Sequence, residues 1–250
     1  MTVDNDEDLA GLRRAGRAVA EARDAMLAAV APGMTTAELD SITRAVLQRH
    51  STRSTPRLAY GFPGTTCISV NDEAAHGIPS ATRRLHAGDL VNVDVSAELD
   101  GYWADTGASA PVGEVSPTAT RLVAATRAAQ ADAMAVARAG RPLRHIGRAV
   151  QRRARRHGFT VVANLNGHGV GRNIHEAPSV PGVEHRHDRT VLWDGLVLAI
   201  EPFLTTGASF VVGDPDGWTL RMPDRSLVAQ FEHTIVVTGG EPIVMTAGAM

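Results

Sequence analysis

The sequence contains one cysteine, Cys67, and no lysine among its 250 residues. A single cysteine cannot form an internal disulfide, so a disulfide-stapled secreted scaffold is excluded and an intracellular location is expected. Arginine carries every positive side-chain charge. We attribute the missing lysine to a bias in base composition and not to a mechanism.

Long apolar runs and a strong net charge are also missing. No apolar stretch approaches the ~20 residues of a membrane span. The acidic start, residues 1–8, has no apolar core of a signal peptide, so a cytoplasmic protein is expected. The net charge is −2, and we therefore expect neither a nucleic-acid nor a membrane partner. No signal for oligomerisation is visible, which favours a monomer.

The chain is long enough to bury a core, with 44% hydrophobic residues. Apolar periodicity and capping signals predict helices. Other segments, between these helices and after them, are predicted to form short strands. The expected helices cover residues 6–30, 35–50, 116–138 and 143–157, and the expected strands cover 65–70, 89–106 as a hairpin, 160–163, 196–203, 218–221 and 228–237.

This order of two helices, strands, two helices and strands suggests two similar halves. It predicts an α+β fold with helices packed on one face of a curved, mainly antiparallel sheet. Residues 51–64 are expected to form a loop. No linker separates the halves, so residues 1–250 are predicted to be a single domain with flexible tails at 1–5 and 241–250.

The hairpin at residues 89–106 places two carboxylates close together. Asp100-Gly101 is a two-residue turn signal, since both residues tolerate positive φ. If the residues that flank this turn pair, Asp105 lies opposite Ser96. Asp94 and Asp105 then become diagonal neighbours on one face, where their charges repel unless a cation lies between them. The alternative is an ordinary water-facing side of the hairpin.

Three further segments carry candidate chemistry. His168 lies between glycines, which allow close approach of the backbone, although a glycine-rich turn with an incidental histidine is the alternative. Glu201 and Glu232 lie in apolar strand segments, where a buried charge needs a partner or a metal. The alternative for both glutamates is a position at a strand end that faces water.

Together these groups are four carboxylates and one imidazole. Hard oxygen ligands with a single histidine suit divalent ions such as Mn, Fe(II) or Co. Two divalent ions would neutralise the four carboxylates, whereas in the empty site the carboxylates would repel one another. Carboxylate-bridged ions about 3.5–4 Å apart are a common two-metal arrangement.

The chain resembles type I methionine aminopeptidases from about residue 6 to 238. The resemblance is carried by the ordered set His76-Gly77-Ile78-Pro79, Asn92-Val93-Asp94-Val95, Asp105-Thr106, Gly167-His168-Gly169-Val170-Gly171, His175-Glu176, Ile200-Glu201-Pro202 and Gln230-Phe231-Glu232-His233-Thr234. It implies the pita-bread fold of the creatinase and aminopeptidase group in metallopeptidase family M24. That fold has two halves related by a pseudo-twofold axis.

The resemblance implies a metallo-exopeptidase that removes the initiator methionine from nascent chains before a small second residue. Two divalent ions (Co, Mn or Fe(II), with Zn and Ni as alternatives) would activate a shared water. By similarity, Asp94 binds one ion, His168 and Glu201 bind the other, and Asp105 and Glu232 bridge them. Glu201 would shuttle the proton, His175 would stabilise the oxyanion, and His76 would contact the substrate backbone.

The resemblance also implies a pocket for the methionine side chain, lined by Cys67, Phe62 and Trp218. Four residues depart from the usual pattern. Ala59-Tyr60 stand where an aromatic residue followed by histidine is common, Gly64 where lysine is common, and Ile174 where phenylalanine is frequent. These departures leave strict selectivity for methionine open, but they do not affect the expected peptidase chemistry.

Other functions remain open from the sequence. An X-Pro aminopeptidase or prolidase would share the fold and metals but usually carries a large N-terminal domain. A non-catalytic binding module on this fold usually loses metal ligands. The run Arg152–Arg156 is interpreted as a solvated helix face and not as a nucleic-acid site. His185 and His187 are expected at the surface, and ribosome contact would have to come from the domain itself.

Overall fold

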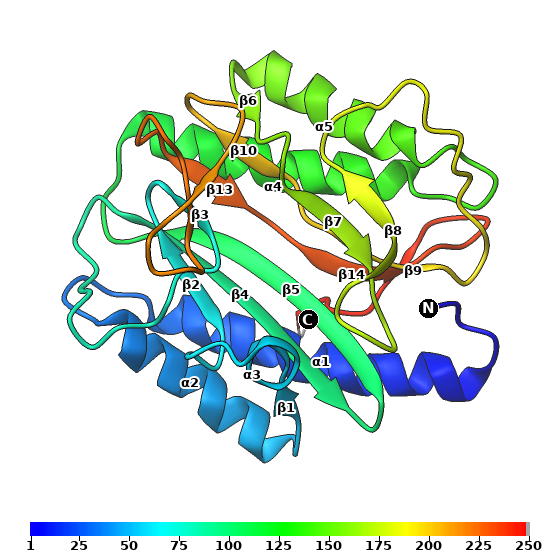
Figure 1. Cartoon of the computed structure of the whole chain (residues 1–250), viewed down its shortest axis with the longest axis horizontal. Coiled ribbons are helices and arrows are strands. Elements are labelled where there is room, and N and C mark those ends of the chain that lie inside the picture. Colours follow the sequence, from blue (N-terminus) through cyan, green and yellow to red (C-terminus); the bar gives the residue numbers. More distant parts are fainter. Residues whose placement is uncertain (249–250) are drawn as a thin grey trace.

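The computed structural model describes residues 1–248, in which two pairs of long helices flank the strands (Figure 1). The helices are α1 Asp6–Ala29, α2 Thr36–Arg49, α3 Thr55–Tyr60, α4 Pro117–Val136 and α5 Arg144–His157. The strands are β1 Arg53–Ser54, β2 Cys67–Val70, β3 Glu73–Ala75, β4 Leu90–Leu99, β5 Tyr102–Pro111, β6 Thr160–Val161, β7 Asn166–Gly169, β8 Glu176–Pro181, β9 Val197–Ile200, β10 Phe203–Thr205, β11 Val212–Gly213, β12 Leu220–Arg221, β13 Val228–Gln230, β14 His233–Val236 and β15 Ile243–Val244.

All four long helices lie where the sequence predicts them, and local signals explain their ends. Thr35 and Glu38 form the expected capping box at the start of α2. The Ser116 hydroxyl accepts from the amide of Ala119 at the start of α4. Gly158 ends α5 in the left-handed conformation, with φ 73°.

The β4–β5 hairpin has the predicted register. Leu99 pairs with Tyr102, and Ser96 therefore pairs with Asp105. Asp100 and Gly101 both have positive φ, 52° and 81°, as a type I′ turn requires. The apolar residues of β4 pack against α1, so the polar residues on the other face point toward the second half of the molecule.

The strands are antiparallel but divide among four sheets instead of forming one. β4 joins β1, β2 and β5, and a five-stranded sheet has the order β15-β14-β9-β7-β8. The remaining strands form two three-stranded sheets with the orders β13-β10-β6 and β11-β12-β3. In Figure 1, α1 and α2 lie along one side of these strands and α4 and α5 along the opposite side. Each pair of helices has its own buried apolar cluster.

The two halves meet along the open edge of β5. Ala108 forms a bridge with Phe231, and the amide of Glu232 donates to the carbonyl of Gly107 at 2.8 Å. The Thr106 hydroxyl donates to the carbonyl of Glu232 at 2.9 Å. These contacts fix the hairpin of the first half against β13 and β14 of the second half.

Several local expectations differ from the structure. Residues 51–64 are not all loop, because β1 pairs with β4 and residues 55–60 form the short helix α3, with Pro56 in its first turn. The expected tails are paired with the body: Thr2 bridges Leu196, and β15 pairs with β14. Residues 249–250 of the expected C-terminal tail lie outside the described residues. Within residues 1–248, no helix has the length and apolar character needed to cross a membrane.

Candidate active site

The polar face of β4 and β5 is buried and does not face water. Asn92 and Ser96 are 7% and 4% exposed, and Asp105 is 7% exposed. The water-facing alternative for this hairpin is therefore wrong, because β13 and β14 of the second half cover the face. Asp94 lies opposite Gly107 on β5, diagonal to Asp105, as the register predicts.

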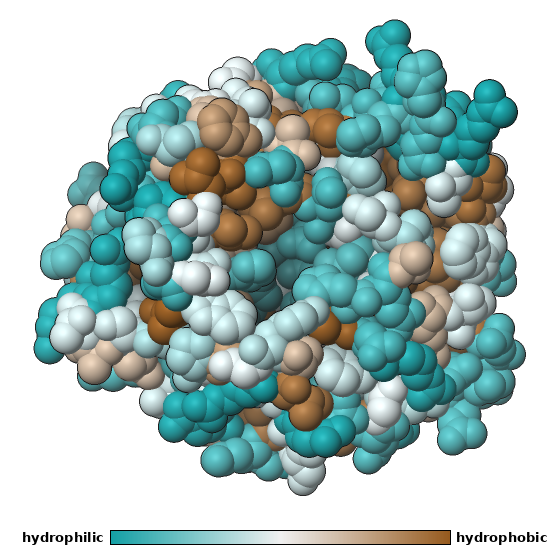
Figure 2. Space-filling view, viewed as in Figure 1, coloured by the Kyte–Doolittle hydropathy of each residue, from teal (hydrophilic) through white to brown (hydrophobic). Residues whose placement is uncertain are grey.

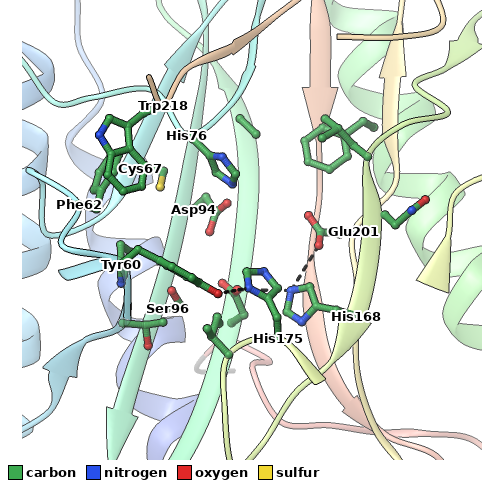
Figure 3. A pocket seen from close by; sticks show the side chains of 18 residues that line it. Tyr60, Phe62, Cys67, His76, Asp94, Ser96, His168, His175, Glu201 and Trp218 are labelled. Carbon is green, nitrogen blue, oxygen red and sulfur yellow. Dashed lines mark hydrogen bonds and ion pairs between the residues drawn. The ribbon is translucent and has the colours of Figure 1, made fainter. Parts of the chain in front are cut away.

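The other candidate groups come from adjacent strands of the five-stranded sheet. His168 on β7 pairs with Ala199 on β9, and Ile200 pairs with His233 on β14. His168 Nε2 lies 3.5 Å from Glu201 Oε1 and 3.9 Å from Asp105 Oδ2 (Figure 3). This pairing brings residues from distant parts of the sequence to one side of the sheet.

The two glutamates lie at breaks between strands and not inside them, which corrects the sequence interpretation. Glu201 follows the end of β9, and Pro202 separates it from β10 in another sheet. Glu232 lies between β13 and β14, again where the chain changes sheets. A strand end releases the backbone from its ladder, so each carboxylate can turn inward instead of alternating with its apolar neighbours.

The glycines on either side of His168 allow close backbone packing, as expected. A Cβ at Gly167 would lie 2.3 Å from the carbonyl oxygen of Ala199. A Cβ at Gly169 would lie 2.4 Å from the carbonyl oxygen of Ala177. Both distances are too short for any side chain. The glycines that flank His168 lie in strand β7 and not in the alternative turn, since β7 pairs on both sides.

The acidic cluster has buried oxygens without partners. Oδ1 of Asp105 and Oε1 of Glu232 make no hydrogen bond among the described residues. One ligand atom from each of Asp105, His168 and Glu232 lies within 4.8 Å of the others. Unpaired buried carboxylate oxygens are costly unless a cation binds them. The donor set therefore fits hard divalent ions, which suit carboxylates with one imidazole.

The pKa shifts of these residues also favour a bound cation. Burial raises the pKa of Asp94 to about 6. Burial, followed by the charges of neighbouring carboxylates, raises the pKa of Asp105 and Glu201 well above the usual range. The pKa of Glu232 is also raised well above the usual range, first by burial and then by the charge of Glu201. Burial lowers the pKa of His168 to about 4, so its imidazole is neutral and able to ligate a metal.

A cavity of about 430 Å³ opens above this cluster, and Figure 2 shows the hollow near the middle of that face. Asp94, Asp105, His168 and Glu201 line its floor. Its other walls include the remaining predicted site residues, namely Phe62, Cys67, His76, His175 and Trp218. Glu232 lies deeper, 1% exposed, and does not line the cavity itself.

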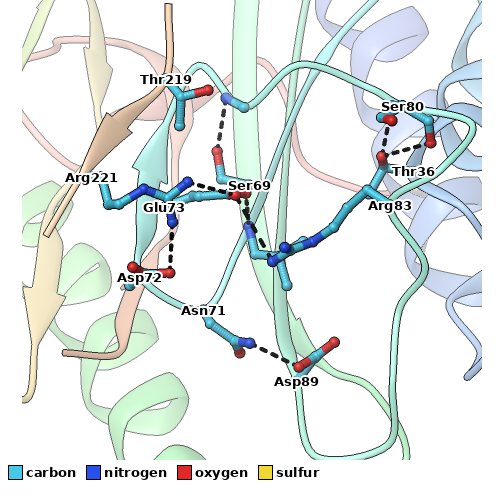
Figure 4. A network of polar contacts seen from close by, with 12 residues as sticks. Thr36, Ser69, Asn71, Asp72, Glu73, Ser80, Arg83, Asp89, Thr219 and Arg221 are labelled. Atoms are coloured by element: carbon cyan, nitrogen blue, oxygen red, sulfur yellow. Dashed lines mark hydrogen bonds and ion pairs between the residues drawn. The ribbon is translucent and has the colours of Figure 1, made fainter. Parts of the chain in front are cut away.

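His76 has an unfavourable backbone conformation for a non-glycine residue, with φ 56°. Such strain persists only where surrounding structure fixes it. A polar network holds the preceding segment: Arg221 contacts Asp72 at 2.9 Å and Glu73 at 3.1 Å (Figure 4). After His76, the amide of Gly77 donates to the Ser69 hydroxyl at 3.1 Å. The imidazole is thereby presented to the cavity, and burial lowers its pKa.

One end of the cavity is apolar. The rings of Phe62 and Trp218 contact edge to face, with centroids 5.2 Å apart, and Cys67 lies beside them (Figure 3). Ile174 also lines the cavity and is 5% exposed. Gly64 leaves no room for a side chain, because a Cβ there would lie 2.6 Å from Pro79. The apolar end is therefore enclosed, even though these positions depart from the usual pattern.

Sequence reasoning did not assign a role to two residues of the site. Tyr60 lines the cavity, and its hydroxyl contacts Nδ1 of His175. The Gln230 amide donates to Oε2 of Glu232 at 3.1 Å and accepts from Asn92 at 2.8 Å. The available signals in the sequence were a tyrosine in the expected loop 51–64, which contains Pro and Gly, and a glutamine two residues before the candidate ligand Glu232. Neither signal shows a contact without the fold.

Comparisons with known proteins agree with this geometry. The model of metallopeptidase family M24 matches residues 10–239. The chain is 48% identical over 247 residues to methionine aminopeptidase 2 of Bacillus subtilis, covering 98% of this chain and 99% of that protein. It is 37% identical over 247 residues to methionine aminopeptidase of Escherichia coli, covering 98% and 94%.

Solved structures give the same result. The crystal structure of methionine aminopeptidase from Thermotoga maritima has a TM-score of 0.95 at 32% identity, covering 98% of this chain and 99% of that one. Prolidase from Pyrococcus furiosus shares the fold, with a TM-score of 0.77 at 20% identity, and this chain covers 66% of it. From the family match, the high identity over nearly the full length and the inward-facing carboxylates, we conclude that this chain belongs to metallopeptidase family M24.

Proposed function

We propose that this chain is a methionine aminopeptidase that removes the N-terminal methionine from proteins with a small second residue. The observation that carries the proposal is the position of the buried acidic cluster beside an enclosed apolar wall. The cluster can serve hydrolysis, and the wall formed by Phe62, Trp218 and Cys67 can hold a thioether side chain. The similarity to methionine aminopeptidases over the whole matched length supports the same function.

Five residues would hold two divalent ions, namely Asp94, Asp105, His168, Glu201 and Glu232. The unpaired oxygens of Asp105 and Glu232 support this assignment. Such ions supply a water activated near neutral pH and an anchor for the free amine of the substrate. Co, Mn, Fe(II), Zn and Ni all suit this ligand set, and the ion used in the cell is a question for metal analysis of the isolated protein.

The remaining steps belong to side chains on the cavity walls. Glu201 accepts the proton of the attacking water at a carboxylate oxygen and passes it to the leaving amine as the C–N bond breaks. His175 is buried enough that its pKa is lowered, so a neutral imidazole faces the substrate. It donates a hydrogen bond to the developing oxyanion. His76 contacts the backbone beyond the scissile bond from its fixed loop.

The biological setting follows from this chemistry. The substrates would be the N-termini of nascent polypeptides, and we therefore propose a cytoplasmic protein that contacts ribosomes. The net charge of the chain is −2, and we propose no nucleic-acid partner. We propose a monomer, since the five ligand candidates and the cavity come from one chain.

The test is release of the N-terminal residue from peptides that begin Met-Ala, Met-Lys, Leu-Ala and Ala-Pro. Protein stripped of metal is reloaded with Mn, Co or Fe(II), and turnover is measured before and after chelation. We expect rapid cleavage of the Met-Ala peptide, slow cleavage of the others and loss of activity with the chelator.

Other results would contradict the proposal in distinguishable ways. Preferred cleavage of Leu-Ala would show that Ala59, Gly64 and Ile174 accompany a different side-chain specificity. Preferred cleavage of Ala-Pro would indicate an X-Pro aminopeptidase. Binding of peptides without turnover under any metal would indicate a non-catalytic binding module.

A further inference from the structure

Tyr60 connects the two halves of the molecule across the cavity. It is the last residue of α3, and Gly61 follows in the left-handed conformation with φ 69°. Its side chain points toward the second half, and its hydroxyl meets Nδ1 of His175 (Figure 3). The two rings lie 5.7 Å apart between centroids. The residue is 51% exposed, so this contact and not core packing determines where the ring lies.

Tyr60 and His175 share one hydrogen bond, and its direction depends on the tautomer of the imidazole. Among residues 1–248, Tyr60 is the only residue hydrogen-bonded to the His175 imidazole, and His175 is the only residue hydrogen-bonded to the Tyr60 hydroxyl. Burial and the charge of Asp105 raise the pKa of Tyr60, so the phenol keeps its proton. A phenol is a stronger donor than acceptor, because its oxygen lone pair is delocalised into the ring, and this favours donation from Tyr60 to Nδ1. A neutral imidazole carries one proton, and a ring whose Nδ1 accepts must carry it on Nε2.

The other surroundings of His175 do not fix its tautomer. The His168 ring packs against it edge to face, with centroids 4.3 Å apart, and makes no hydrogen bond to it. The backbone of the loop 170–175 sets the position of the ring but offers its nitrogens no partner among the described residues. The choice between an Nδ1 proton and an Nε2 proton therefore depends on the Tyr60 hydroxyl.

We propose that Tyr60 is a positioning residue that holds His175 in the Nε2–H tautomer through its hydroxyl, so that Nε2–H is the donor offered to substrate. This inference rests on the proposed peptidase function for its kinetic consequence, but the tautomer can be tested without turnover. A histidine in the opposite tautomer would present a lone pair to the developing oxyanion and repel it.

The experiment compares the wild type with Tyr60→Phe, which removes only the hydroxyl. The matched control is Tyr102→Phe, since Tyr102 is the other tyrosine of the chain and its hydroxyl contacts Asp8 at 3.1 Å, away from the cavity. Nitrogen-15 NMR of histidine-labelled, zinc-loaded protein distinguishes protonated from unprotonated ring nitrogens. The signals of His175 are assigned by their loss in His175→Gln.

We expect an unprotonated Nδ1 and a protonated Nε2 for His175 in the wild type and in Tyr102→Phe. In Tyr60→Phe we expect a mixture of tautomers. With a Met-Ala peptide and Mn, kcat of Tyr60→Phe should fall about tenfold or more, as for other partners that orient a functional histidine, while KM changes less than about twofold.

The outcomes separate the two proposals. An Nδ1-protonated His175 in the wild type, or unchanged His175 signals in Tyr60→Phe, would overturn the role of Tyr60 whatever the activity. A change in KM alone would also overturn it, because that result indicates direct substrate contact. The expected signals in a protein that cleaves no peptide would support the tautomer assignment and refute the proposed function instead.

Discussion

The hydroxyl of Thr234 is hydrogen-bonded twice to the backbone of Asp105. It accepts from the Asp105 amide at 2.9 Å and donates to the Asp105 carbonyl at 2.8 Å. One side chain thus takes the place of a strand partner on the open edge of β5. Because Thr234 follows Glu232 by two residues, the pair also fixes the position of Glu232 relative to Asp105.

Replacement of Thr234 with valine should therefore lower both stability and metal affinity. The shape is kept, but a buried amide and a buried carbonyl lose their partner, at about 1–3 kcal/mol for each unsatisfied group. Urea unfolding and calorimetric titration with Mn measure the two effects. Thr234→Ser keeps the hydroxyl and should recover most of the metal affinity. Equal metal affinity in Thr234→Val and the wild type would contradict the prediction.

Gln230→Leu should weaken metal binding about 10- to 100-fold, since partners that orient ligating groups typically contribute that much. The leucine loses the hydrogen bond that orients Glu232 and leaves Asn92 with fewer acceptors. Gln130→Leu is the control. Gln130 is also buried, 4% exposed, but it lies on α4 and its amide nitrogen has no partner among the described residues. The control should bind Mn like the wild type, and a comparable loss there would refute a specific role for Gln230.

Asp94 should make the metal-free protein less stable as pH rises. Its pKa is raised from 3.8 to about 6 in the folded state. The folded protein then holds a proton that the unfolded chain has lost, so stability falls between about pH 4 and 6. At neutral pH this loss is at most about 3 kcal/mol. His168 acts in the opposite direction, because its lowered pKa makes stability rise with pH.

A comparison of chelator-treated wild type with Asp94→Asn isolates the share of Asp94, since His168 is present in both. Urea unfolding from pH 4.5 to 7.5 should show that the free energy of unfolding of the variant rises relative to that of the wild type as pH increases. A constant difference across this range would mean that Asp94 is not protonated in the metal-free site.

Gly167→Ala should disrupt the site through the backbone. The new methyl group would meet the carbonyl of Ala199 at 2.3 Å and force β7 away from β9. Overpacking of this kind typically costs about 1–3 kcal/mol, and here it also displaces His168. Thermal unfolding and Mn titration should both show a loss. Gly213→Ala, where nothing lies within 4 Å, is the matched control and should leave both unchanged.

Local rules predicted the elements with strong periodicity or a definite turn. The hairpin register followed from Asp100-Gly101 alone, and with it the diagonal placement of Asp94 and Asp105. The four long helices followed from their caps and apolar spacing. These features depend on neighbours in the sequence, so the sequence contains enough information to place them.

The rest depends on contacts between distant segments. Whether the hairpin face meets water or protein could not be decided from the hairpin, because β13 and β14, within residues 228–236, cover it. The strand breaks at Glu201 and Glu232 arise where the chain changes sheets, and an apolar run does not reveal this. The contact of Tyr60 with His175 spans 115 residues and has no signature in either segment.

The division of the ligand candidates between the two halves affects synthesis of the protein. A growing chain displays Asp94 and Asp105 while His168, Glu201 and Glu232 have yet to be made. The carboxylates from the first half then remain a wet hairpin face without a complete set of donors. If all five residues bind the ions as proposed, capture of the ions must wait until residue 232 has left the ribosome and the second half has closed over the first. The protein would then be inactive until its own translation is nearly finished.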